Sequence, residues 1–212
     1  MAALESKEGG RGPLWGRSPA SQQRRRDILL AAKKVFFAEG YQLASIDQIA
    51  AAAGTTKRTV YDHFGSKETL FTEAIGFAAD QFVTLLPAAA DLPRAPQDGI
   101  RAFIARLRAL VVSPDIVRFQ RLVIAEAERH PALGQVLHTR AIAGGERVLV
   151  DYLDACVADG RLAAQDTAVA ARTLIELAIG AMRLRALMGL ESAADALDDM
   201  ALDAAVARVL AR

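Results

Sequence analysis

The sequence TTKRTVYDHFGSKETLF, residues 55–71, contains two helix starts separated by a single glycine. Thr56 is a natural N-cap for a short helix over residues 57–63. Ser66 can cap the next helix, and Glu68 lies in its first turn, where the helix dipole favours an acid. The stretch therefore predicts two consecutive helices, of which the first is only about two turns long.

Two further helices are predicted before this stretch. Apolar residues recur at i, i+3, i+4, i+7 and i+8 over residues 21–39, and Gly40 follows where a residue with positive φ ends a helix. Ser45 and Gln48 have the spacing of a capping box, at the start of a helix that Gly54 ends after two turns. Two short helices joined by a glycine turn, with a longer helix before them, have the plan of a helix-turn-helix over residues 45–64.

The second short helix carries the residue types that DNA recognition needs. A recognition helix enters a major groove about 12 Å wide, so it must be short and must offer donors on its exposed side. Val60 is the one purely apolar residue between positions 57 and 63, and three helix N-termini can each hold a phosphate. The alternative is that these side chains only cap helices, pack or form a solvated face. The candidate DNA-binding residues are Ser45, Thr56, Lys57, Arg58, Thr59, Tyr61, His63 and Lys67.

The formal net charge of +1 hides an uneven distribution of charge. Residues 1–70 hold 11 Lys and Arg against 7 Asp and Glu, a balance of +4, and the remaining 142 residues hold 15 against 18, a balance of −3. A basic front and an acidic back favour two parts with different partners, although a chance fluctuation of a few charges is the alternative. The basic part coincides with the predicted helix-turn-helix.

The composition predicts an all-α protein. The 212 residues include 44 alanines, the best helix former, and only 6% are aromatic. Including the four helices at the front, about nine helices are expected, and a kink or break is predicted at Gly144-Gly145. We divide the chain into a disordered arm (1–20), a helix-turn-helix domain (21–83) and a helical domain (84–212). The helices predicted in the last part span residues 98–112, 114–129, 131–159, 166–190 and 195–210.

Nothing in the sequence indicates a metal site, a cofactor site or a catalytic centre. The single cysteine, Cys156, has no partner for an internal disulfide, and His130 and His138 lie eight residues apart without a tidy set of further ligands. The first 20 residues lack the apolar segment of a signal peptide, and charges interrupt the most apolar stretch, residues 173–190. We therefore expect a cytoplasmic protein that does not contact membranes and is not an enzyme.

With these motifs in place, residues 21–83 resemble the DNA-binding domain of the tetracycline-repressor-like (TetR) family. The family often has Ser where this chain has Thr56. It often has Gly or Pro where this chain has Arg58, and the arginine adds a candidate for a bidentate contact to guanine. Residues 119–133 resemble one branch of the family's C-terminal domains more weakly. The matching residues are Ile28, Leu29, Ala31, Ala32, Phe36, Gly40, Tyr41, Ser45, Ile46, Ile49, Ala50, Ala53, Gly54, Thr56–Val60, Tyr61, His63, Phe64, Ser66, Lys67, Glu68, Leu70 and Phe71.

The resemblance implies a homeodomain-like DNA-binding domain joined to a helical domain that binds a small-molecule effector and forms a homodimer. Pairing would use the last two helices, about 166–190 and 195–211. The small residues Ala178, Gly180 and Ala181 suit such a seam, although packing within one chain is the alternative. The apolar face of the helix over 166–190 comprises Leu174, Leu177, Ala181, Leu184 and Met188.

Two hypotheses for the function follow. The first is a ligand-responsive regulator, a repressor that binds a palindromic operator of double-stranded DNA as a homodimer and is released by an effector. The second is an architectural or activator DNA-binding protein without an effector. A large apolar pocket with a few polar groups favours the first, and a solid core favours the second. Candidate effector-binding residues, with core packing as the alternative for each, are Phe103, Phe119, Tyr152 and Met182.

Overall fold

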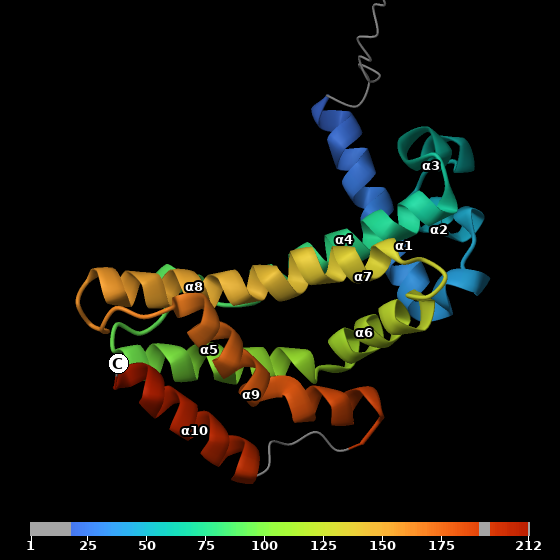
Figure 1. Cartoon of the computed structure of the whole chain (residues 1–212). Helices are drawn as coiled ribbons and strands as arrows, with labels where there is room; N and C mark the ends of the chain where they lie inside the picture. Colours follow the sequence, from blue (N-terminus) through green and yellow to red (C-terminus); the bar gives the residue numbers. More distant parts are fainter. Residues whose placement is uncertain (1–17, 191–195, 212) are drawn as a thin grey trace, which may run out of the picture. The chain divides into compact units, whose positions relative to one another are not determined.

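The structure is a computed structural model that describes residues 18–190 and 196–211 (Figure 1). These residues form helices and no strand, which confirms the all-α prediction. The predictions for the first 17 residues lie outside the described residues. The elements are α1 (Pro19–Leu43), α2 (Ile46–Ala52), α3 (Lys57–Phe64), α4 (Lys67–Thr84), the 3₁₀ turn η2 (Ala89–Asp91), α5 (Pro96–Val111), α6 (Pro114–Glu126), α7 (Ala132–Leu137), the π-helical segment η3 (His138–Ile142), α8 (Ala143–Ala158), α9 (Thr167–Leu187) and α10 (Ala196–Leu210).

The chain forms two compact units, one up to Phe71 and one from Thr72 onward. The division lies inside α4. The domain boundary drawn from the sequence at residues 83–84 coincides instead with the end of that helix at Thr84. Each unit has its own buried apolar core, so each is described separately below.

The first unit is built around the apolar faces of α1 to α4. The rings of Phe36 and Phe71 lie 4.7 Å apart between centroids and join α1 to α4. Gly40 has φ 75° and interrupts α1 at the predicted position. The helix begins at Pro19, two residues earlier than predicted, because Ser18 caps it and proline suits the first helical turn. The fully or almost fully buried core residues of this unit are Ile28, Ala32, Phe36, Ile49, Val60, Leu70 and Phe71.

In the second unit, α7, η3 and α8 run on without interruption from residue 132 to residue 158. Apart from η2, and with α7, η3 and α8 counted as one helix, the described residues therefore form nine helices, in line with the expected number. No break occurs at the predicted position, Gly144-Gly145, which lies in the first turn of α8; the helix departs from α geometry just before it, at His138–Ile142. The glycine instead permits a close approach, because a Cβ at Gly144 would lie 2.9 Å from Cγ2 of Val83 on α4.

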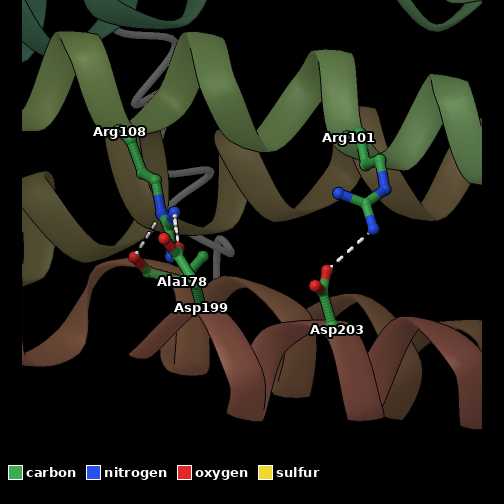
Figure 2. Close-up of polar contacts among 5 residues, drawn as sticks. All are labelled: Arg101, Arg108, Ala178, Asp199 and Asp203. Carbon is green, nitrogen blue, oxygen red and sulfur yellow. Dashed lines mark hydrogen bonds and ion pairs between the residues drawn. The ribbon is translucent and has the colours of Figure 1, made fainter. Parts of the chain in front are cut away.

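Two arginines of α5 connect it to the last two helices (Figure 2). Arg108 donates through Nε to the carbonyl oxygen of Ala178 on α9, at 2.9 Å, and pairs with Asp199 on α10. Arg101 pairs with Asp203, one turn further along α10, at 2.8 Å. The two ion pairs differ in burial: the Arg108 side chain is only 17% exposed, whereas that of Arg101 is 52% exposed.

Candidate nucleic-acid interface and cavity

The two short helices α2 and α3 begin with the caps that the sequence predicts. The backbone N–H of Gln48 donates to Oγ of Ser45 at 3.2 Å, and the N–H of Ser45 donates back to Oε1 of Gln48 at 2.7 Å. The N–H of Thr59 donates to Oγ1 of Thr56 at 3.2 Å. Between them Gly54 takes φ 60°, a backbone conformation that other residues rarely adopt. The turn therefore fixes where α3 starts.

One side of α3 is buried and the other is open to solvent. Val60 and Phe64 are 1% and 5% exposed and attach the helix to the core. Lys57 and Arg58 are exposed, and so is the ring of Tyr61. This outward surface, Lys57, Arg58 and Tyr61, is called the donor face below. Three side chains that can donate hydrogen bonds thus share one short, rigid helix, as direct reading of base edges and phosphates requires.

The residues of the donor face differ in their partners. Nζ of Lys57 lies 2.9 Å from Oδ2 of Asp47 in the first turn of α2, and this contact raises the pKa of Lys57. Arg58 makes no hydrogen bond or ion pair within the part of the chain that the structure describes. No sequence pattern predicts the contact between Lys57 and Asp47, because the two residues belong to different helices.

The remaining candidate DNA-binding residues lie beside the donor face. Thr59 and His63 are half-buried, and burial together with the charge of Arg25 lowers the pKa of His63. Nζ of Lys67 lies 4.5 Å from the ring centroid of Tyr41. Arg25 of α1 stacks on Phe64, with Cζ 4.4 Å from the ring centroid. Lys67 and Arg25 thus also hold the helices of this unit together.

A cavity of about 120 Å³ lies inside the second unit. Residues from α4 to α9 line it, and most of them are apolar. Phe119 is one of the lining residues, whereas the other three effector candidates, Phe103, Tyr152 and Met182, are not and lie in the core. The periodicity of single helices could not reveal the cavity, because each helix contributes only between one and four of the lining residues. Its polar lining residues are Gln120, Glu146, Glu176 and Arg183.

Tyr152 has a structural role in this unit. Its hydroxyl lies 2.7 Å from the carbonyl oxygen of Pro93 and 3.2 Å from that of Ala95, and donates to this segment before α5. Burial raises its pKa to about 12. Gly99 leaves the space that the hydroxyl occupies, since a Cβ there would lie 1.9 Å from the oxygen. The hydroxyl of Tyr152 is therefore hydrogen-bonded to the backbone of this chain.

The apolar side chains of α9 point in two directions. Leu174 and Ala178 are buried inside the unit, whereas Leu177, Leu184 and Met188 are 39%, 55% and 66% exposed. The apolar face predicted as a single surface is therefore divided between the core and solvent. Within the described residues, no helix has both the length and the apolar character needed to cross a membrane.

Comparisons with known proteins agree with this architecture. The model of the C-terminal domain of AefR-like transcriptional repressors matches residues 98–212, and the model of bacterial regulatory proteins of the tetR family matches residues 28–74. A solved TetR-family regulator from Mesorhizobium loti superposes with a TM-score of 0.75 at 27% identity, covering 92% of this chain and 98% of that one. The flavonoid-responsive regulator FrrA gives a TM-score of 0.69 at 26% identity over 90% of this chain and 96% of FrrA.

Two curated relatives match more locally. The transcriptional activator FasR of Mycolicibacterium smegmatis is 32% identical over 88 residues, which are 40% of each chain. The transcriptional repressor NicS of Pseudomonas putida is 41% identical over 59 residues, 28% of each chain. The matched segments thus span less than half of the length of these relatives.

Proposed function

Because this chain belongs to the TetR family of transcriptional regulators, we propose that it binds a palindromic operator as a homodimer, represses transcription there and is released by a small-molecule effector. The donor face of α3 carries the proposal. Lys57, Arg58 and Tyr61 are exposed on a helix whose opposite side, Val60 and Phe64, is buried. Such a helix can enter a major groove without losing its attachment to the domain.

Binding to DNA would combine base contacts with phosphate contacts. Arg58 is the candidate for a bidentate contact to guanine, since it has no other partner among the described residues. The N-terminus of α4, capped by Ser66, and the neighbouring Lys67 can hold a backbone phosphate. In a homodimer, two such helices would lie about 34 Å apart, one turn of B-DNA. Half-sites with that spacing or somewhat more are therefore expected.

The exposed apolar surface of α9 and α10 supports the homodimer. Val169, Leu177 and Leu184 of α9, its C-cap Met188, and Met200 of α10 are between 39% and 68% exposed. Several large apolar side chains exposed on the same two helices are candidates for an interaction site. Covering it with a second copy would form a bundle of four helices, two from each chain.

The cavity supports control by an effector and favours a regulator over an architectural protein. It is mostly apolar with a few polar groups, as small-molecule sites are. A ligand there would release DNA only by binding the non-binding arrangement more tightly. Among the similar proteins, FrrA is a flavonoid-responsive regulator, NicS is a repressor and FasR is an activator. FrrA and NicS support a ligand-responsive repressor. Because FasR is an activator, the direction of regulation is measured separately below.

An electrophoretic shift assay with DNA from upstream of the protein's own gene tests the proposal. We expect the double variant Arg58→Ala/Tyr61→Ala to weaken specific binding by tenfold or more, since each base contact contributes about 1–3 kcal/mol. Arg118→Ala is the matched control, because this exposed arginine lies on α6 outside the helix-turn-helix unit. Unchanged binding by the double variant would reject the site.

Two further measurements test the other parts of the proposal. Sedimentation of the wild-type chain should give a dimer, and Leu184→Lys should give monomers by placing a charge in the apolar surface. A promoter fused to a reporter gene should be more active when the regulator is deleted. A less active promoter would instead identify an activator.

A further inference from the structure

A single buried amide provides the most deeply buried polar group of the cavity. Gln120 is 8% exposed and lines the cavity. Its Nε2 donates to the carbonyl oxygen of Val111 at 3.3 Å, and a carbonyl can only accept, so this contact fixes the orientation of the amide. Oε1 then makes no hydrogen bond within the described residues. The cavity therefore contains an acceptor that lacks a donor.

The surroundings of this amide are apolar and small. Side chains such as Phe82, Leu107, Phe119 and Ile175 line the same cavity of about 120 Å³. An apolar cavity of roughly 150 Å³ accommodates one benzene ring. The available space therefore suits a single six-membered ring, and a larger molecule would have to extend through the mouth.

The charged groups around the cavity balance each other. Glu176 is exposed, and Glu146 and Arg183 are half-buried, so all three are less buried than Gln120. Glu146 also pairs with Arg172 at 3.5 Å. Two carboxylates and two guanidinium groups leave no net charge that would attract an anion or a cation.

We propose that the cavity selects a neutral, ring-sized apolar molecule with one hydroxyl group, a simple phenol or its alicyclic counterpart, and that the hydroxyl donates to Oε1 of Gln120. The ring displaces water from apolar walls, and the hydroxyl donates to the amide oxygen of this largely buried residue. A ring without a donor leaves that oxygen desolvated and unpaired, which penalises its binding. The inference deepens the proposed effector response and rests on it only for the consequence on DNA.

Calorimetric titration of the full chain with phenol, toluene and benzoate tests this selectivity. Toluene has nearly the shape of phenol but no donor, and benzoate carries a charge. Wild type should bind phenol more tightly than toluene and should not bind benzoate measurably. In Gln120→Met, which keeps the length of the side chain, the order should reverse. The ratio of the two dissociation constants should change by about tenfold, the equivalent of one hydrogen bond.

Gln135→Met is the matched control, because Gln135 is exposed on α7 and does not line the cavity. It should keep the preference of the wild type for phenol. The three probes on wild type alone remain decisive if Gln120→Met does not fold. The inference is overturned if wild type binds toluene as tightly as phenol, if it binds benzoate best, if it binds none of the probes, or if Gln120→Met keeps the original ratio.

A shift assay on the operator keeps this inference separate from the proposed function. Phenol binding without any DNA binding would overturn the regulator while leaving the ligand class intact. Operator binding by a chain that binds none of the probes would support the regulator and overturn the proposed ligand class. Phenol binding that leaves the DNA complex unchanged would remove the effector response but not the selectivity of the cavity.

Discussion

Replacing Asp47 by asparagine should strengthen the binding of this regulator to its operator. In the free protein, Nζ of Lys57 lies 2.9 Å from Oδ2 of Asp47, and the pairing raises the pKa of the lysine. Lys57 therefore has to leave a partner before it can contact a phosphate. Asparagine keeps the size of the side chain at the start of α2 but removes the charge that holds the lysine.

The expected size of the effect follows from the exposure of the pair. The two side chains are 52% and 68% exposed, and such surface pairs contribute about 0.2–1 kcal/mol. Because about 1.4 kcal/mol corresponds to a tenfold change, Asp47→Asn should raise operator affinity by up to about fivefold. If the freed Lys57 adds one phosphate contact, the dependence of log K on log salt should steepen by about 0.9.

Fluorescence anisotropy with a labelled operator at several salt concentrations measures both quantities. Asp62→Asn is the control, because it removes the same charge from α3 itself. Within the described residues, Asp62 makes no ion pair with a lysine. Lys57→Met completes the cycle and should cost more affinity in the Asp47→Asn background than in wild type. Equal gains from the two asparagine variants, or an equal cost of Lys57→Met in both backgrounds, would refute the reasoning.

Three further predictions concern stability. Arg108→Met should lower the free energy of unfolding by about 2 kcal/mol in urea, because a largely buried charged donor is lost, whereas Arg101→Met should cost less than about 1 kcal/mol. The free energy of unfolding should fall as pH rises from 10 to about 12, because the folded state keeps the Tyr152 proton that the unfolded state loses. Unfolding curves at alkaline pH should not show this decline for the Tyr152→Phe variant. The pKa of His63 is lowered, so its NMR titration midpoint should lie below 6.5. The unfolded state then binds a proton first, so the free energy of unfolding should fall as pH drops through 6.5. The His63→Gln variant should not show this fall.

The parts of the fold that were predictable from the sequence depend on neighbouring residues. The capping box of Ser45 with Gln48 and the positive φ of Gly40 are confirmed, because each is set within a few positions of the chain. The buried position of Val60 is likewise a consequence of helical spacing within α3. Local hydrogen bonding and backbone sterics were therefore enough to place the helix-turn-helix.

The parts that the sequence did not predict depend on which helices meet. The pair of Lys57 with Asp47 links residues of different helices, and no periodic pattern marks it. Gly144 suggested a break, but its missing side chain makes room for α4. Tyr152 suggested a ligand contact, but its hydroxyl bonds to the segment before α5. In each case the role of the residue depends on a contact with a residue that is distant in the sequence.

Helix α9 shows why the effector site and the dimer surface were the hardest features to separate. Its apolar residues serve three surroundings: Leu174 is buried in the core, Ile175 and Ile179 line the cavity, and Leu177 and Leu184 face solvent. Because apolar positions occur almost all round the helix, its amphipathic pattern is weak and does not identify these faces. The same arrangement restricts how an effector could act. A molecule at Ile175 and Ile179 contacts the rigid element that would also form the subunit interface, so it can change the spacing of the two recognition helices only if it binds one arrangement of α9 more tightly than the other.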